Sequence, residues 1–283
     1  MIQVAGRPYG IDDAESPDRL ERIIIELMSR ASAVYSFPTE QGLQFEINLR
    51  KNIVQSAESM SKSDVSFATF ETTRSNPQYW VLTNYGALHL RPGVQPADAV
   101  EDIYVNSGQY AFECAGAMLI IYYHAVLQVL GARTFNFLFP DLYIYSWHAD
   151  SDLGLYPLNT RNYLPGDVVY FDNPDFDPSA PQWRGENAVA MGEYLYFGHG
   201  LGVLSEKQMV ETLNELRRPG AYTSSYLTNL VVRPTFSHLQ QFAVRGQSEF
   251  VRKYQPALIL HNESSIPYER YRYYMNKVFK QLF

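Results

Sequence analysis

Apolar residues recur every three or four positions between residues 45 and 60, namely Phe45, Leu49, Ile53, Ala57 and Met60. Side chains at this spacing share one face of an α-helix, so the pattern predicts an amphipathic helix that covers a core. Two further helices are expected over residues 20–29 and 206–218. The second has Ser205 and Gln208 at its start in the spacing of a capping box, and Pro219 and Gly220 at its end.

The most apolar stretch of the chain runs over residues 115–131, where only His124 and Gln128 interrupt it. A helix that is apolar nearly all round is expected to be buried. A membrane span is the alternative, but about 16 residues rise only about 24 Å, short of the roughly 30 Å hydrocarbon core. We therefore expect a buried central helix.

Shorter runs with aromatic and β-branched residues predict strands. Turn-forming residues separate the first three runs, which predicts a small antiparallel meander over residues 66–70, 79–83 and 87–90. Four more strands are expected at residues 142–147, 167–171, 187–191 and 193–197. Helices and strands together predict the α+β class.

Composition bounds the possible functions. The 283 residues are 46% hydrophobic and 19% charged, which is typical of a globular protein with one main domain. The net charge of −7 argues against nucleic acid as a partner, because nucleic-acid binders need clustered Lys and Arg. The chain has one cysteine, which excludes an internal disulfide and a zinc site built on several thiolates. Its first residues lack the pattern of a secretory signal, so we expect cytoplasmic synthesis without a signal peptide.

Cys114 lies in YAFECAGAM, directly before the apolar helix. Unpaired amides at a helix N-terminus favour a thiolate, which can attack carbonyl carbons. The alternative is a small buried hydrophobe, the commoner role of a free cysteine.

A thiol enzyme also needs a proton acceptor, and the strand-rich region after the helix offers Glu186 in WRGENAV and His199 in YFGHGLG. From the residues alone His199 is the default choice, since its neutral ring can accept a proton near pH 7. Proton transfer from a thiol to a carboxylate is unfavourable by roughly 5.7 kcal/mol, because the ordinary pKa values of Glu and Cys lie about 4.2 units apart. Burial and a second carboxylate, Glu113, would raise the Glu186 pKa. The alternative for His199 is a loop histidine in a glycine turn, and the alternative for the two glutamates is a surface or ion-paired role.

No strong metal site is predicted. Asp172, Asp175 and Asp177 in FDNPDFDP lack the glycine and spacing of a calcium loop, and the two prolines favour a turn. The six histidines include no HExxH pair.

Five motifs occur in order: YAFECAGAM, LPGDVVYF, NPDFDP, QWRGENAV and YFGHGLG. In these the chain resembles the spore-coat transglutaminases of bacilli, over residues 1 to about 221. The resemblance implies a papain-like, NlpC/P60-like core with the nucleophilic cysteine on a buried helix against an antiparallel sheet. It also implies one transglutaminase domain over residues 1–244. Residues 245–283 would then be a Tyr/Arg/Lys-rich extension of unknown role.

The resemblance assigns roles to the candidate residues. It makes Cys114 the nucleophile, Glu186 its principal catalytic partner and Glu113 an auxiliary carboxylate, with His199 secondary. Trp147, Trp183 and Phe67 are candidates for an aromatic wall around the substrate, and core packing is the alternative for each.

The activity implied is cross-linking of protein glutamine to protein lysine through a thioester, with release of ammonia and without cofactor or calcium. Spore-coat proteins would be the partners and the spore surface the final location. The alternatives are a cysteine amidase or peptidase of the same fold, and a catalytically silent structural coat protein.

Overall fold

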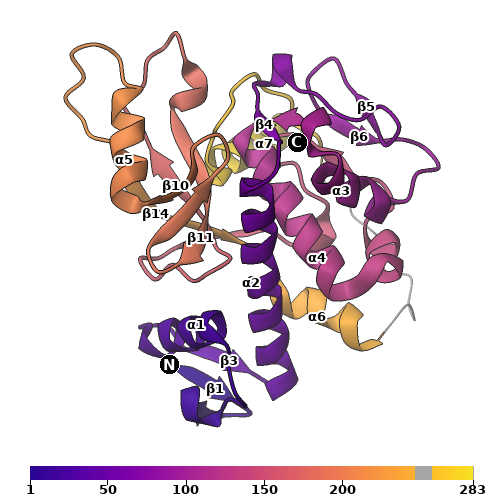
Figure 1. The fold of residues 1–283 in the computed structure, drawn as a ribbon, viewed down its shortest axis with the longest axis vertical. Helices are drawn as coiled ribbons and strands as arrows, with labels where there is room; N and C mark the ends of the chain where they lie inside the picture. The colour runs from indigo at the N-terminus through magenta and orange to yellow at the C-terminus, as the bar shows by residue number, and fades with distance from the viewer. Residues whose placement is uncertain (246–256, 283) are drawn as a thin grey trace.

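The structure is a computed structural model that describes residues 1–245 and 257–282. One long helix, α2 (Glu40–Ser61), runs between two parts of the molecule (Figure 1). On one side lies the main antiparallel sheet, and on the other lie α3 (Pro96–Val105) and α4 (Cys114–Leu138). The N-terminal strands and α1 (Arg19–Arg30) pack against the first half of α2.

The main sheet has six strands in the order β13-β12-β11-β10-β14-β9, and every neighbouring pair is antiparallel. In chain order the strands are β9 (Tyr156–Asn159), β10 (Val168–Asp172), β11 (Gly185–Gly192), β12 (Leu195–Gly198), β13 (Gly202–Ser205) and β14 (Tyr226–Arg233). Helix α4 packs on β11, which places the helix that carries Cys114 against the centre of this sheet. The α+β class and the papain-like arrangement expected from the sequence are confirmed.

Helix α4 is the buried central helix expected from the apolar stretch. It is long and apolar enough to cross a membrane, but 72% of its most apolar part is buried inside the protein. The helical path breaks at Gly131, whose φ of +75° is unfavourable for other residues, and then continues to Leu138. The break coincides with the helix end predicted from the sequence.

Small sheets surround this core, and one of them corrects the predicted meander. Strands β5 (Trp80–Leu82), β6 (Leu88–Leu90) and β8 (Tyr143–Ile144) form an antiparallel sheet. The first run is not part of it. Its strand β4 (Ser66–Phe67) pairs in parallel with β7 (Ala111–Phe112), directly before Cys114. A third sheet joins β1 (Ile2–Val4), β2 (Arg7–Tyr9) and β3 (Tyr35–Phe37).

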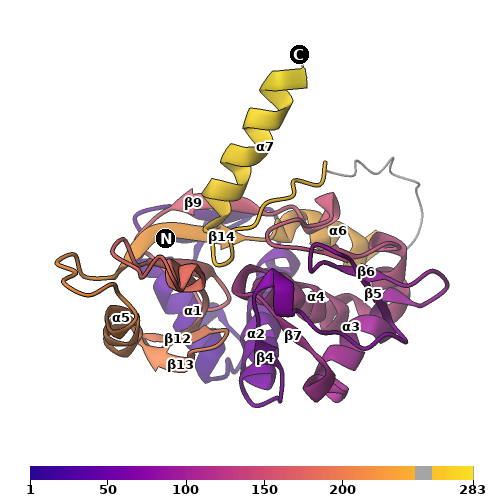
Figure 2. The ribbon, with the colours of Figure 1, turned by 90° about the horizontal axis from the view of Figure 1, so that it is seen from above.

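The remaining helices are α5 (Glu206–Glu215), α6 (Phe236–Arg245) and α7 (Tyr268–Leu282), with short 3-10 turns at η1 (Ile11–Asp13), η2 (Phe70–Thr72), η3 (Ser107–Gln109), η4 (Ser151–Leu153) and η5 (Pro181–Trp183). The capping box before α5 is present, with Gln208 N donating to Ser205 Oγ and Ser205 N to Gln208 Oε1. Of the predicted extension, residues 246–256 and 283 lie outside the described residues. Figure 2 shows α7 standing away from the rest of the molecule.

A buried ion network joins α2 to the sheet. The Asp167 carboxylate accepts from Arg50 Nη1 at 2.8 Å and from Arg233 Nε and Nη2 at 2.6 and 2.7 Å. Burial by itself raises the pKa of Asp167, but the two guanidinium groups outweigh it and hold that pKa below its usual range. This network fixes the start of β10 against the middle of α2.

Candidate active site

Cys114 is the first residue of α4, and Glu113 is the N-cap of this helix. The Glu113 carboxylate accepts hydrogen bonds from Ala115 N at 2.9 Å and from Gly116 N at 2.6 Å. These amides carry much of the positive potential at the helix terminus. The Glu113 carboxylate therefore offsets the positive potential at the helix terminus, which was expected to favour a Cys114 thiolate.

Asn187 contacts the thiol from the sheet. Its Nδ2 donates to Cys114 Sγ at 3.2 Å and also to the Ile266 carbonyl oxygen at 3.1 Å. Side chains alternate along a strand, so Asn187 and Glu186 leave β11 on opposite sides, but the Glu186 carboxyl group, beside Gly198, is still near enough for its charge to raise the pKa of the Cys114 thiol. The motif WRGENAV pointed to Glu186 and not to Asn187, although the predicted packing of a sheet on the cysteine helix was a signal for Asn187.

Glu186 is fully buried, with 0% of its surface exposed. Among the described residues neither of its carboxyl oxygens has a well-formed hydrogen bond, and the backbone amide of His199 makes only a loose contact. Gly198 leaves room for this side chain, because a Cβ at that position would lie 2.9 Å from Glu186 Oε1. A buried carboxyl without good partners destabilises a fold, so this group is retained at a cost.

Burial dominates the electrostatics of these three groups. Burial first, and then the charge of Glu113, raise the pKa of Glu186 well above its usual range. The pKa of Glu113 is also raised by burial, although backbone amides partly oppose the rise. The pKa of the Cys114 thiol is raised by burial and by both carboxylates, opposite to the direction expected from its helix position alone. Burial and the two neighbouring carboxyl groups therefore favour the protonated form of the thiol.

His199 is buried between two aromatic rings, Phe112 at 5.0 Å and Phe67 at 6.0 Å between ring centroids. Its Nε2 lies 3.1 Å from the Phe112 carbonyl oxygen, so this nitrogen is directed at the backbone before Cys114. Burial lowers the pKa of His199 to about 4, which keeps the ring neutral near pH 7.

The three aromatic candidates divide into two groups. Phe67 stacks on Trp183, with ring centroids 5.3 Å apart, and both side chains are half-buried. Trp147 is almost completely buried, and its indole Nε1 donates to the Ile266 carbonyl at 2.9 Å. Phe67 and Trp183 therefore form an aromatic pair beside His199, whereas Trp147 lies under a segment of the C-terminal part of the chain.

That C-terminal segment also reaches the thiol. The backbone amide of Ser265 faces the Glu113 carboxylate, and its hydroxyl faces Cys114 closely enough to lower the thiol pKa, without forming a well-aligned hydrogen bond. This contact could not be predicted from the sequence, because residues 257–267 have neither periodicity nor a recognisable motif.

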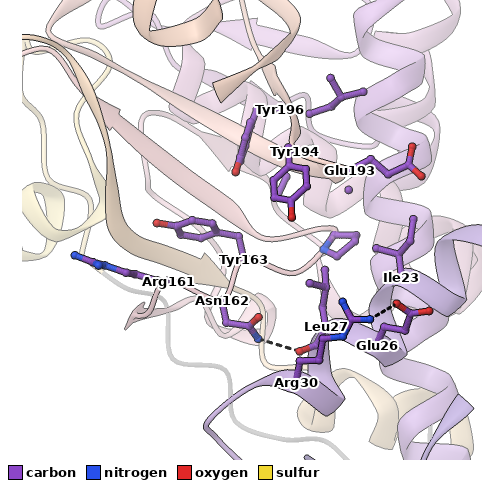
Figure 3. A pocket seen from close by; sticks show the side chains of 14 residues that line it. Ile23, Glu26, Leu27, Arg30, Arg161, Asn162, Tyr163, Glu193, Tyr194 and Tyr196 are labelled. Carbon is purple, nitrogen blue, oxygen red and sulfur yellow. Dashed lines mark hydrogen bonds and ion pairs between the residues drawn. The ribbon is translucent and has the colours of Figure 1, made fainter. Parts of the chain in front are cut away.

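Two cavities help to delimit the site. One of about 400 Å³ lies between α1 and the β11–β12 hairpin, where Arg30 pairs with Glu26 (Figure 3). It is lined by none of the seven candidate residues. The other, of about 470 Å³, lies between η2, η5 and the C-terminal segment, and includes Phe70, Tyr145, Gln182 and Ser264 in its lining. Ser264 precedes Ser265, so this second cavity adjoins the thiol site.

The aspartates of FDNPDFDP serve other partners. Asp175 accepts from Arg218 Nη2 at 2.7 Å and from the Tyr222 and Thr223 amides, and Asp177 accepts from the Ser179 hydroxyl. These carboxylates organise the turns around α5.

A buried helix with a cysteine at its N-terminus, packed on an antiparallel sheet that carries a buried carboxyl group, is the arrangement of the papain-like fold class. Residues 1–243 match the model of the family described as protein-glutamine gamma-glutamyltransferase. A protein of this description from Halalkalibacterium halodurans is 42% identical over 275 residues, which cover 97% of each chain. Another from Bacillus pumilus is 38% identical over 85% of this chain and 98% of its own length.

A solved structure is similar as well. The transglutaminase from Geobacillus stearothermophilus, without C-terminal extension, matches with a TM-score of 0.70 and 45% identity, over 72% of this chain and 98% of its own. The chain belongs to the protein-glutamine gamma-glutamyltransferase family, the transglutaminases, and is an enzyme of the transferase class.

Proposed function

We propose that this enzyme joins the side chains of glutamine and lysine in proteins, with Cys114 as its nucleophile and Glu186 as the proton-transfer partner. The observation that carries this is the convergence of the chain's single thiol with two buried carboxyl groups, one of them without well-formed hydrogen bonds. Stability does not account for such a carboxyl, whereas a chemical role does.

In the first half of the reaction, the ionised Glu186 accepts the thiol proton and the thiolate attacks the carboxamide carbon of glutamine. Asn187 Nδ2, at 3.2 Å from Sγ, stabilises the thiolate by donating to it. Glu186 returns the proton to the amide nitrogen as the C–N bond breaks. Ammonia leaves and a thioester remains on Cys114.

In the second half, a neutral lysine ε-amine attacks the thioester and gives a proton to Glu186. The new C–N bond forms as the C–S bond breaks, and Glu186 then returns the proton to the thiolate. Water competes for the same thioester, so a buried site that limits water favours the amine. The Phe67–Trp183 pair is proposed as an apolar wall for the slender alkyl chain of lysine, with Glu113 as an auxiliary carboxylate.

No cofactor enters these steps, and we propose that the activity is independent of calcium. Equal activity in calcium and in a chelator is expected, and loss of activity in the chelator would contradict the proposal. The resemblance to spore-coat transglutaminases supports coat proteins as substrates and the spore surface as the final location. Fractionation of spores tests the location, and a protein absent from the coat fraction would refute it.

Incorporation of a fluorescent primary amine into a glutamine-rich protein tests the reaction. Cys114→Ser and Glu186→Gln are expected to lose about 10²-fold or more, since general acid–base catalysis contributes about that much. His199→Ala is expected to retain measurable activity, and Glu58→Gln, which alters an exposed carboxylate, is the matched control. Ammonia release without incorporation would indicate a hydrolase. If the wild type neither incorporates the amine nor releases ammonia, the proposal is refuted and a structural role is favoured.

A further inference from the structure

Residues 257–267 form an irregular segment before α7, here called the cap segment, that covers Cys114. The thiol is 0% exposed, and so are Ser265 and Ile266 above it. A nucleophile that must reach a protein side chain cannot act while it is buried in this way. Part of the cover has to move before a substrate enters.

The body of the enzyme holds the cap segment by its backbone. Four polar side chains donate to three of its carbonyl oxygens: Trp147 and Asn187 to Ile266, at 2.9 and 3.1 Å, Tyr170 to Ser265, at 3.2 Å, and Tyr145 to His261. Hydrogen bonds of this kind go to the peptide backbone and therefore do not depend on the side chains of the bound segment. Enzymes and binding domains hold extended peptides in the same way. These four donors, here called the groove, hold the cap segment as they could hold a substrate peptide.

The groove leads to the reacting atoms. Asn187 Nδ2 contacts both the Ile266 carbonyl and Cys114 Sγ, so one side chain links the bound backbone to the thiol. Ser265 adopts a φ of +58°, an unfavourable left-handed conformation for a serine, and this turn brings its amide to Glu113 and its hydroxyl to Cys114. Polar groups of the cap segment thus lie where the carboxamide of a glutamine substrate would have to lie.

Polar contacts also hold the outer end of the cap segment, in addition to the burial of Ile259 and Ile266 in the core. Glu263 pairs with Arg184 of the neighbouring loop at 3.3 Å, and both side chains are partly exposed, at 24% and 14%. The cavity of about 470 Å³ beside it has His261, Asn262 and Ser264 as part of its lining. Movement of the cap segment would therefore join this cavity to the thiol.

We propose that the cap segment occupies the binding site for the glutamine-bearing peptide, and that the enzyme is autoinhibited until a substrate strand displaces it. This rests on the proposed function, because it identifies the groove with the acyl-donor site. The lysine substrate attacks only after the thioester has formed, so the cap segment competes with the glutamine donor and not with the amine.

Modification of the chain's single cysteine by iodoacetamide tests whether the cap segment covers Cys114, without any assay of activity. Glu263→Gln removes the ion pairs of the cap segment with Arg184 and with Arg270 of α7, whereas Arg184→Gln removes only the first of them. Glu269→Gln is the matched control, because this carboxylate is exposed on α7 nearby. Both loosening variants are expected to react about tenfold faster than the wild type, and the control at the wild-type rate, with all four proteins folded by circular dichroism. Equal rates in all four would overturn the proposal.

Kinetics with a glutamine peptide and a fluorescent amine test the identity of the groove. A competing cap raises the apparent KM of the donor in proportion to its occupancy. Loosening is therefore expected to lower the donor KM by up to about tenfold, with kcat and the amine KM unchanged. An unchanged donor KM in variants that are labelled faster would overturn the assignment of the groove. Absence of turnover in every protein would refute the proposed function, while the labelling result would still decide whether the segment covers the thiol.

Discussion

The buried Asp167 network offers the sharpest test of the fold that positions the site. Asp167→Asn keeps the size of the side chain but removes its charge, which leaves the buried Arg233, 5% exposed, without its anion and the buried Arg50, 0% exposed, with only Glu46. Removing one partner of a buried ion pair typically destabilises a protein by about 3–5 kcal/mol. At about 2–4 °C per kcal/mol for a protein near this size, the melting temperature should fall by roughly 6–20 °C.

Thermal unfolding followed by circular dichroism, at one scan rate, measures this change. Glu58→Gln is the control, because the exposed pair of Glu58 with Lys62 should contribute no more than about 0.5 kcal/mol. The folded-state pKa of Asp167 is lowered, so its stabilisation is present above the usual carboxyl pKa and is lost as pH falls through the lowered value. The difference between wild type and Asp167→Asn should therefore shrink in acid. A fall of less than about 2 °C at pH 7 would show that the Asp167 network contributes little to stability.

Three further predictions concern the site and its supports. Glu113→Gln removes the charge that is the second cause, behind burial, of the raised pKa of Glu186. The acidic limb of the kcat/KM profile should therefore move to lower pH, and a move to higher pH would contradict this. Gly198→Ala places a Cβ 2.9 Å from Glu186 Oε1, so amine incorporation should fall by about tenfold or more while the protein stays folded, and full activity would show that the close approach is unimportant. Ser205→Ala breaks the capping box of α5 and should lower stability by about 0.5–2 kcal/mol in denaturant titrations without loss of activity.

Sequence periodicity was sufficient for the long elements. The apolar face of α2 and the continuous apolar run of α4 each predict a helix, because many residues must agree with the period of 3.6. The two-residue strands β4 and β7 carry no usable period, and their parallel pairing is a tertiary contact between residues 45 positions apart. The predicted meander was wrong at this point for that reason.

The site shows the same division. Cys114 at a helix start could be predicted from the residues, whereas the choice of Glu186 over His199 required the resemblance. The structure adds a physical reason to examine Glu186, since its carboxyl is buried without good partners while His199 Nε2 faces a backbone carbonyl. Asn187 and Ser265 reach the thiol only through packing of distant segments, which neither composition nor local spacing encodes.

The most direct test of the account is to trap the thioester. The enzyme is incubated with a glutamine-containing peptide in the absence of amine, quenched in acid, and analysed by intact and peptide-level mass spectrometry. We expect an adduct on Cys114 with the mass of the peptide less ammonia, which disappears when a primary amine is added and is absent from Cys114→Ser. Amine incorporation by the wild type without any adduct on Cys114, or an adduct on another residue, would contradict it.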